Sequence, residues 1–593
     1  MYQAPLRDLL FVLHRQLQVQ RLAAWPLYAD YAPDVASSVL EEAGRFASEI
    51  LEPLNAVGDR EGAKWSPQGV TTASGFRDAY QRYVRDGWPL LAVPAEQGGQ
   101  GAPLALATAV EEVWFAANVA FMLCPQLGRG AVEAITMAGS AELRERFLPR
   151  MVSGEWTGTM NLTEPQAGSD LAAIRTRAMP EGDHHRIFGQ KIFITWGEHD
   201  MAENIVHLVL ARIDGAPPGV KGISLFVVPK FLDDGSPNDL RCVSIEHKLG
   251  IHASPTCVMS YGDGPGALGY LVGKANHGLQ YMFVMMNSAR LSVGVQGIGL
   301  SERAFQQALS WARTRVQGRP MQAAAAAGGG APTIIQHPDV RRMLLLQKSS
   351  VEAMRALALY TALQLDLAHA AGDGQALARG ELLIPIVKGW STEQANELAS
   401  LAVQVHGGMG FIEETGVAQT LRDARITAIY EGTTGIQAND LLGRKLLRDD
   451  GAALRDVLAA FTALLADATP AAAAGGDGAV AGVLRSARDA LEHVGHAGAA
   501  LLALSGRAPA AAYGVSVPFL KLCGLAFGAA LLAQGAALAE DLAVENGAER
   551  DFAAAKLQCA VFHALHCLPA ARALAEIVQR GGDCVADARA ELL

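Results

Sequence analysis

Cysteine, aromatic residues and positive charge are all scarce in this sequence. Its 593 residues include seven cysteines, none of them in a Cys-X-X-Cys pair, so we expect reduced thiols and no zinc site. The 49 Lys+Arg are outnumbered by 60 Asp+Glu, and the formal net charge of −11 argues against a general nucleic-acid binder. Aromatic residues make up only 6% of the chain, while Ala and Leu dominate, which favours helices.

The chain also lacks the marks of export and of membrane insertion. Met1 to Asp8 do not combine a basic start with an apolar run, as a signal peptide does. The apolar stretch 499–504 is short, and the stretch 525–538 contains Gly and Gln, so we expect no membrane-spanning helix. These absences predict a cytoplasmic protein.

Length and periodicity indicate how the chain is divided. At 593 residues it is long enough for three or four domains with buried cores. Helical spacing in 35–50 and 105–120 gives way to short β-branched and aromatic runs in 192–195, 205–210 and 223–228, and it returns near residue 280. We predict an α+β fold, mainly α, in four parts: residues 1–157 helical, 158–279 β, 280–450 helical and 451–593 helical.

One short segment suggests acid–base chemistry. Residues 429–435 read IYEGTTG, after the charged run 422–425. Glycine lets the backbone bend sharply behind Glu431, so the carboxylate can reach into a cleft and act as a base toward a carbon acid. The segment alone is also typical of an ordinary turn, and the choice depends on other motifs.

Two further motifs stand upstream in the expected order. Residues 161–170 read NLTEPQAGSD and are followed by GQKIFIT at 189–195, and residues 403–411 read VQVHGGMGF. Together with the Glu431 turn, they resemble the acyl-CoA dehydrogenase family over about residues 40–445. The resemblance implies a helical N-terminal domain, a middle β-barrel or sandwich and a C-terminal four-helix bundle. Residues 451–593 resemble the extra helical domain of the long bacterial members, and 191–195 and 247–256 look most like the 3-methylmercaptopropionyl-CoA dehydrogenase group.

The reaction implied by the resemblance is FAD-dependent α,β-dehydrogenation of an acyl-CoA to the trans-2-enoyl-CoA, as in fatty acid β-oxidation. Glu431 matches the base that takes the α-proton, and its pKa would rise beside a buried acyl chain. The family's alternative base position is Ala289 here, which cannot accept a proton. Arg290 matches a residue of the substrate site that helps to order the catalytic loop, although a surface or capping arginine is an equal alternative.

The resemblance also implies a set of cofactor residues, completed by a second subunit. Short hydroxyl side chains can reach the flavin without filling the cleft, on a turn fixed by Pro165 and Gly168. Because the site needs a neighbouring chain, a homodimer or a dimer of dimers is expected. The implied residues are Thr163, Ser169 (which also meets substrate), Phe193 and Thr195 at the flavin, Arg315 (or its rival Arg319) at the pyrophosphate, Gln404, Gly407 and Gly408 at the adenosine, and Thr433.

Several alternatives stay open. Electron-transfer flavoprotein is the implied acceptor, but an acyl-CoA oxidase would share every motif. A DNA-associated alkylation-response flavoprotein is disfavoured, because residues 451–593 hold 10 Lys+Arg against 14 Asp+Glu, and DNA binding needs a basic face. Another possibility is that the helices of residues 451–593 serve only assembly. Trp114 and Phe115 either shorten the acyl pocket or belong to the core. His252, His406 and the pair at 184–185 receive no metal or acid role.

Overall fold

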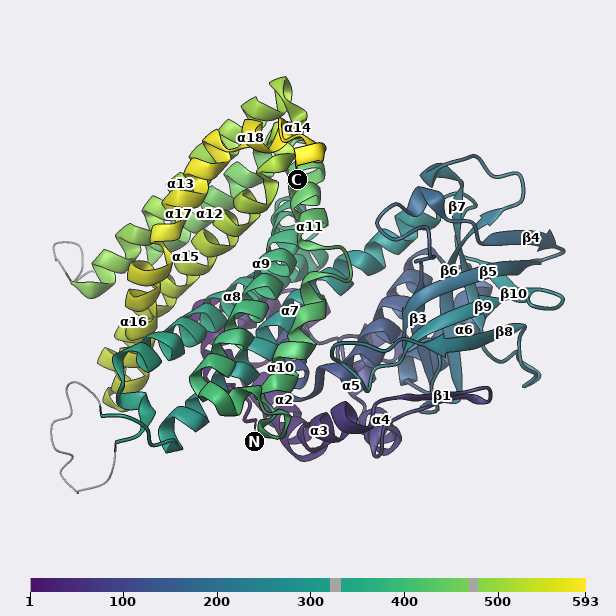
Figure 1. Cartoon of the computed structure of the whole chain (residues 1–593), viewed down its shortest axis with the longest axis horizontal. Coiled ribbons are helices and arrows are strands. Elements are labelled where there is room, and N and C mark those ends of the chain that lie inside the picture. The colour runs from purple at the N-terminus through teal and green to yellow at the C-terminus, as the bar shows by residue number, and fades with distance from the viewer. Residues whose placement is uncertain (1, 320–331, 469–477, 593) are drawn as a thin grey trace. The chain divides into compact units, whose positions relative to one another are not determined.

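The computed structural model describes residues 2–319, 332–468 and 478–592 (Figure 1). The described chain forms two compact units. We call residues 45–102 and 117–292 the β unit, and residues 2–44, 103–116 and 293–592 the helical unit. The Ala/Gly-rich low-complexity stretch 322–331 and most of a second one, 466–479, lie outside the described residues.

The β unit is built around a closed ring of strands. Strand β5 pairs with β4 and β10 through its first half and with β9 through its second half. Because β10 also pairs with β7, the order β10–β7–β6–β4–β5 returns to β10 and closes a ring, while β9 and β8 continue from β5 and β3 pairs with β6. This confirms the predicted middle β domain. The strands are β3 (Trp156–Asn161), β4 (Arg177–Glu181), β5 (His184–Thr195), β6 (Asn204–Ile213), β7 (Ile223–Pro229), β8 (Leu240–Ile245), β9 (Thr256–Tyr261) and β10 (Ala267–Leu271).

Side-chain alternation along the strands gives the β unit two cores. In β6, Leu208 and Leu210 join one cluster, while Val209 and Ala211 join the other. Successive side chains of a strand point to opposite faces, so one run of apolar residues serves both. The first cluster includes residues of α5 (Leu104–Ala138), α6 (Ala141–Ser153) and the start of α7 (Gly278–Thr314). The second is the interior of the ring.

The remaining elements of the β unit come from the N-terminal part of the chain. A two-stranded hairpin, β1 with β2, interrupts a region that the sequence predicted to be wholly helical. The hairpin was missed because its strands are only three residues long. Asn118 has non-helical angles (φ −158°, ψ 89°) within α5, next to the point where that helix leaves the helical unit. The elements are α3 (Glu52–Glu61), β1 (Lys64–Ser66), β2 (Gly69–Thr71) and α4 (Phe76–Arg85).

The helical unit contains the long helices of the predicted bundle and of the C-terminal region. Helix α15 packs against α8, α9, α13, α16 and α17, and its burial explains why it is apolar on nearly all sides. The extra C-terminal helical region is thereby confirmed. The helices are α1 (Leu6–Leu10), α2 (Pro33–Phe46), α8 (Pro338–Ala371), α9 (Gly374–His406), α10 (Val417–Ala424), α11 (Thr434–Asp440), α12 (Ala452–Asp467), α13 (Ala479–Arg507), α14 (Pro509–Gly514), α15 (Ser516–Glu545), α16 (Arg550–Phe562), α17 (Pro569–Arg580) and α18 (Gly582–Ala586).

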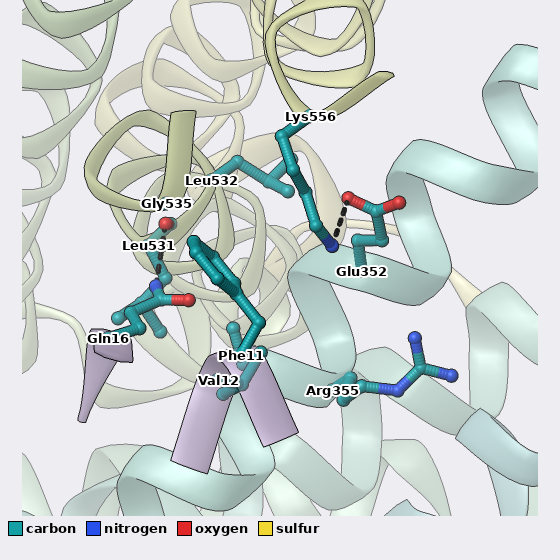
Figure 2. Close-up of a pocket in the computed structure, with 10 residues that line it drawn as sticks. Phe11, Val12, Gln16, Glu352, Arg355, Leu531, Leu532, Gly535 and Lys556 are labelled. Carbon is teal, nitrogen blue, oxygen red and sulfur yellow. Dashed lines mark hydrogen bonds and ion pairs between the residues drawn. The ribbon is translucent and has the colours of Figure 1, made fainter. Parts of the chain in front are cut away.

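Buried ion pairs connect distant parts of the helical unit. Arg355 of α8 is 2% exposed and binds Glu112 of α5 at 2.5 Å and Glu302 of α7 at 2.7 Å. Figure 2 shows Lys556 of α16 pointing toward Glu352 of α8, with 3.2 Å between Nζ and Oε2. The cavity beside these residues is about 10 Å³, which is room for one water molecule and not for a substrate.

Three described segments are long and apolar enough to cross a membrane, by length and composition alone: Leu104–Ala138, Ser516–Glu545 and Gly547–Arg580. This corrects the expectation from the sequence that no stretch of the chain is long and apolar enough. The apolar windows of the first two are 100% and 83% buried inside the protein, and that of the third is 33% buried. The Gly and Gln residues within 525–538 do not interrupt α15, which continues through them. That none of the three spans a membrane stays a prediction.

The predicted four-part division also stays a prediction. The compact units divide the chain differently, because residues 1–157 contribute to both of them. Helix α5 is the reason, since its first 13 residues belong to the helical unit and the rest to the β unit. Sequence periodicity detects such a helix, but not the change of neighbours along it.

Candidate active site

Glu431 stands in a strained turn of the helical unit. Its φ of 53° lies in the left-handed region, which costs a non-glycine residue about 1–3 kcal/mol. Gly432 follows at φ 89°, and a Cβ there would lie 2.8 Å from Nε2 of Gln437, so only glycine fits. The glutamate side chain is half-buried. The sequence predicted the sharp bend at Gly432, but not the left-handed conformation of Glu431 itself.

Two buried side chains hold this turn through its main chain. Lys388 of α9 donates from Nζ to the Gly432 carbonyl at 2.6 Å. Gln437 of α11 donates from Nε2 to the carbonyls of both Glu431 and Gly432, each at 3.1 Å. Lys388 and Gln437 are both 0% exposed. The backbone around the carboxylate is therefore fixed from two helices.

The residues that flank Glu431 are fixed as well. The Tyr430 hydroxyl donates to Oε1 of Gln296 in α7, and burial raises the Tyr430 pKa well above its usual value, with the nearby charge of Glu431 adding to the effect. Thr433 caps α11 by accepting from the Ile436 amide at 3.3 Å. Thr434 donates to Glu393 at 2.6 Å. Thr433 is thus exposed beside Glu431 and also has a structural role.

In the β unit, the turn that carries Thr163 is organised by Glu164. This carboxylate is 3% exposed and accepts from Lys191 Nζ at 2.8 Å and from Thr176 Oγ1 at 2.6 Å. It also accepts from the Arg175 amide at 2.7 Å and from Gln166 Nε2 at 2.6 Å. Burial alone would raise its pKa, but Lys191 and the other donors lower it to about 2.

Lys191 links that turn to strand β5. Its Nζ donates to the Leu162 carbonyl at 2.9 Å as well as to Glu164. Burial lowers the Lys191 pKa to about 8, with the Glu164 charge opposing the effect, so the pair is ionised at neutral pH. The Thr163 carbonyl accepts from the Ile192 amide at 3.0 Å. The structure therefore brings the Thr163 turn beside the residues 192–195.

Phe193 is presented to solvent by a bulge in β5. The pairing of β5 with β9 shifts register between Lys191 and Ile194, and Phe193 between them has φ 59°. Its side chain is 58% exposed, which is unusual for a large aromatic residue on a strand. Thr195, two residues on, is half-buried, and its carbonyl accepts from Thr159 Oγ1 at 2.7 Å. A left-handed, exposed phenylalanine beside hydroxyl residues is a candidate surface for a planar ring.

The conformation of Gly168 does not require a glycine. Its φ is not positive, and a Cβ added there would meet nothing within 4 Å. The turn is closed instead by main-chain bonds between Glu164 and Ala167, at 3.0 and 2.9 Å, with Pro165 between them. Ser169 follows, exposed. The turn is thus closed by Glu164 and Ala167, and the chain bends again at Gly168, whose part in fixing the turn stays a prediction.

The cofactor candidates of the helical unit lie around an aromatic stack. Trp311 of α7 stacks on His406 of α9 with 5.1 Å between ring centroids, and the Arg315 guanidinium lies 5.8 Å from the Trp311 ring. The chain after His406 exposes Gly408, where a Cβ would meet nothing within 4 Å. Gln404 is exposed one turn earlier. The structure thus brings Arg315 to the end of α9.

These surroundings fit a large anionic cofactor. The indole N–H of Trp311 is buried and has no hydrogen-bond partner among the described residues, so a donor is left over at this point. Open space over the glycines at 407–408 and the exposed Arg315 provide room and charge. Arg319 is exposed as well, and nothing in the structure separates it from Arg315 as the partner of a phosphate.

The remaining candidates are buried. Arg290 of α7 is 3% exposed, which removes the alternative of a surface arginine. Ala289 before it is 7% exposed and offers only a methyl group, as the sequence indicated. Trp114 and Phe115 are 3% and 0% exposed, and the Trp114 indole donates to the Ala43 carbonyl at 3.1 Å. Both are therefore core residues.

The structure groups the predicted residues into two sets. Glu431, Thr433, Arg315, Gln404 and Gly408 belong to the helical unit. The β unit contains Thr163, Ser169, Phe193, Thr195 and Arg290. The two sets belong to different units, and each unit is described separately. Contacts between Glu431 and the flavin residues therefore stay a prediction.

In the described part of the chain, no three His, Cys, Asp or Glu residues are grouped so that they could hold a metal ion. His252 binds the Asp59 carboxylate at 2.8 Å and the Lys248 carbonyl at 3.0 Å. His184 lies between Asp183 and Glu181 in a strand turn. These histidines have structural partners, as expected.

Sequence reasoning missed the two buried lysines, Lys191 and Lys388, and Gln437. Lys191 stands inside the GQKIFIT motif, and its position among apolar strand residues was the available signal. Lys388 follows the apolar run at 382–387, where a lysine is unusual. Gln437 gives no sign in the sequence, because its role depends on the fold of the 429–434 loop.

Comparison with known proteins gives a consistent result along the chain. Residues 35–155, 159–263 and 276–446 match the family models for the N-terminal, middle and C-terminal domains of acyl-CoA dehydrogenase. Residues 443–589 match the model described as acetyl-CoA dehydrogenase C-terminal like.

Individual relatives match most of the chain. It is 49% identical to the 3-methylmercaptopropionyl-CoA dehydrogenase of Ruegeria pomeroyi, over 94% of this chain and 95% of that protein. It is 36% identical to the broad-specificity linear acyl-CoA dehydrogenase FadE5 of Mycobacterium tuberculosis, over 77% of each. The crystal structure of an acyl-CoA dehydrogenase from Bacillus anthracis complexed with FAD has the same fold, with a TM-score of 0.72 at 21% identity over 96% of this chain and 91% of that one.

Proposed function

The chain belongs to the acyl-CoA dehydrogenase family and is an FAD-dependent oxidoreductase, and from this premise we propose that it oxidises an acyl-CoA to the 2-enoyl-CoA with Glu431 as the base. The predicted family, fold and cofactor are confirmed by these matches. The observation that carries the proposed role of Glu431 is its conformation. A half-buried carboxylate is kept in a left-handed turn by side chains from two helices, an arrangement that costs energy.

In this proposal the chain's residues handle one proton. The Glu431 carboxylate takes the Cα proton, and the Cα–H electron pair becomes the second bond between Cα and Cβ, while the Cβ hydrogen leaves with its electron pair. FAD, when bound, accepts that hydride. Ala289 offers no competing base. Arg290, buried in the β unit, would order the substrate side, and Thr163, Ser169, Phe193 and Thr195 would hold the flavin.

For the substrate, we propose a short linear acyl group with a sulfur atom at the position after Cβ. The support is the 49% identity to a 3-methylmercaptopropionyl-CoA dehydrogenase over nearly the whole of both chains, against 36% to an enzyme named for linear acyl-CoAs. Pentanoyl-CoA is the matched comparison, because it replaces the sulfur by a methylene and keeps the chain length.

The test is an anaerobic titration of the purified holoenzyme, watching the visible flavin absorption. Bleaching by 3-methylmercaptopropionyl-CoA at a lower concentration than by pentanoyl-CoA is the expected result. Equal bleaching by both would reject the thioether preference and keep the dehydrogenation. A flavin that no short, medium or long acyl-CoA bleaches would reject the whole proposal.

We propose a homodimer, or a dimer of dimers, as the working unit, located in the cytoplasm. Directly after the Gln404–Gly408 segment the chain exposes Met409, Phe411 and Ile412 by 42%, 87% and 44%. Adjacent exposed apolar side chains favour a protein interface. Phe411→Asp should lower both the mass measured by light scattering and the FAD content, and a variant that stays dimeric would exclude this surface.

Electron-transfer flavoprotein is the proposed acceptor. Turnover with that protein should exceed turnover with dissolved oxygen alone. Equal rates would favour the oxidase.

A further inference from the structure

We propose that Lys388 and Gln437 are positioning residues that set the place of the Glu431 carboxylate by holding the carbonyls behind it. The inference rests on the proposed function of Glu431 and goes beyond it, because it assigns the control of the base to two side chains that never meet the substrate. We call these two residues the clamp.

The contacts of the clamp converge on consecutive peptide groups. Three donor contacts, at 2.6, 3.1 and 3.1 Å, reach two carbonyls, those of Glu431 and Gly432. Each carbonyl fixes the orientation of one peptide plane. The Glu431 carbonyl lies in the plane that directly follows the Cα of Glu431, and the Gly432 carbonyl lies in the next plane, so the two held planes flank Gly432. The clamp therefore holds the main chain that follows the Cα of Glu431, from which the carboxylate side chain projects.

The protein maintains this arrangement at a cost. Oε1 of Gln437 is buried and has no hydrogen-bond partner among the described residues, which is unfavourable. The left-handed Glu431 adds strain. Two unfavourable features around a single loop point to a functional demand, because stability alone would select against them.

Helix α15 of the C-terminal region supports the clamp from behind. Next to Lys388, Gly389 lies so close to Leu520 of α15 that a Cβ would approach its side chain to 2.8 Å. The following residue, Trp390, packs against Gly524 and Gly528, where an added Cβ would lie 2.4 and 2.8 Å from the indole. Helix α11, which carries Gln437, also packs against α15. The clamp therefore rests on a rigid, close-packed surface.

A positioning role makes a distinct kinetic prediction. Proton abstraction needs the carboxylate within hydrogen-bond reach of Cα, and a displacement of about 1 Å can cost about 100-fold in rate. Binding of acyl-CoA and of FAD depends on other residues. Loss of the clamp should therefore lower kcat while leaving KM and FAD content nearly unchanged.

The decisive variant is Lys388→Met, which keeps the length and removes the charge and the donors. We expect kcat of the holoenzyme to fall by about 10- to 100-fold, with KM and FAD content within about twofold of the parent. With an α-deuterated substrate, the isotope effect on kcat should increase, because proton removal becomes more nearly rate-limiting. A merely structural lysine would not change the isotope effect.

Two parallel variants separate the possible failures. Lys556→Met removes another buried lysine of the same unit, one whose partners are Asp8 and Glu352, far along the sequence from the loop. It should keep the parental kcat and isotope effect per bound FAD. Glu431→Gln tests the proposed function itself: if that variant still turns over, the role of Glu431 fails, whatever Lys388→Met does.

Gln437→Met provides a second route, should Lys388→Met not fold. It removes two of the three contacts, and kcat should fall by roughly 10-fold, again with a larger isotope effect. The proposal is overturned if an inactive Glu431→Gln accompanies clamp variants with parental kcat. It is also overturned if their loss of kcat only follows their loss of FAD, or if Lys556→Met raises the isotope effect equally.

Discussion

Two turns of this molecule each contain a glutamate and accept a hydrogen bond from a buried lysine, but the lysines bind different groups of the two turns. In the β unit, Glu164 is surrounded by donors, and Lys191 binds its carboxylate directly. In the helical unit, Lys388 and Gln437 bind the carbonyls behind the side chain of Glu431. The first arrangement holds the charge of a carboxylate, and the second holds its backbone.

The difference decides what each carboxylate can do. The Glu164 carboxylate accepts several hydrogen bonds and an ion pair, which lower its pKa to about 2. It is therefore a poor base. A base needs a fixed position, and Lys388 and Gln437 contribute to it at Glu431 through main-chain carbonyls. Residue type and turn composition are similar at the two sites, so the placement of the donors makes the distinction.

The largest expected effect comes from Glu431→Gln. The amide keeps the shape but cannot accept the α-proton, so kcat should fall by at least about 100- to 10,000-fold. The visible flavin spectrum should be unchanged, because the substitution alters neither the size of the side chain nor the turn. Stopped-flow reduction of the bound flavin by substrate measures the loss.

The same substitution at the other turn is its control. Glu164→Gln should lower flavin reduction only as far as FAD is lost, and full-occupancy protein should react at close to the parental rate. Retention of more than about a tenth of the activity by Glu431→Gln would contradict the proposed assignment of roles.

The second effect is on stability and falls on the other glutamate. Glu164→Gln leaves the ammonium of Lys191 buried without its counter-charge, which should cost about 3–5 kcal/mol of unfolding free energy. Urea unfolding followed by circular dichroism measures it. The double variant Glu164→Gln with Lys191→Met removes both charges, so it should be more stable than the single variant. A double variant less stable than the single one would show that the pair is not the source of the loss.

A third expected effect, about 3 kcal/mol, is the pH dependence of the same pair. The folded Glu164 pKa of about 2 lies below its ordinary value of 4.5, so the unfolded chain binds the proton first as the pH falls. The stabilisation is fully present above about pH 4.5 and is lost progressively toward pH 2. Unfolding free energies between pH 6 and pH 3 should therefore fall less steeply in Glu164→Gln. Parallel slopes for parent and variant would mean that Glu164 is not held as an anion.

Much of the fold could be predicted from the sequence, because helical spacing and short β-branched runs are local patterns. The strands at 192–195, 205–210 and 223–228 and the return of helices at 278 were confirmed. The hairpin at 64–71 was missed, since three-residue strands carry too little periodicity. The passage of α5 between two units was also missed, because a helix that changes neighbours keeps its own spacing throughout.

Of the candidate site, the residues within motifs could be predicted from the sequence, and the residues that support them could not. Motifs identified Glu431 and the residues around the flavin turn, because each motif is contiguous in sequence. The roles of Lys388 and Gln437 depend on contacts across 44 and 6 residues, which no local pattern records. The chain does bend at Gly168, as the glycine in the motif suggested, although its φ is not positive.

The smallest expected effect is on FAD binding and concerns Phe193, a second residue with a positive φ that can be compared with Glu431. Its φ of 59° resembles that of Glu431, but no clamp of buried side chains is needed to explain it, since the bulge in β5 produces it. Phe193→Ala should weaken FAD binding by roughly 2- to 10-fold, which corresponds to the loss of one aromatic contact of about 0.5–1.5 kcal/mol. Because the ring is 58% exposed, the unfolding free energy of the apoprotein should change by less than about 0.5 kcal/mol. Val220→Ala, at another exposed apolar side chain of the β unit, should leave FAD affinity unchanged. A Phe193→Ala apoprotein that loses more than about 1 kcal/mol, with parental FAD affinity, would show that the ring stabilises the strand and has no part in the flavin site.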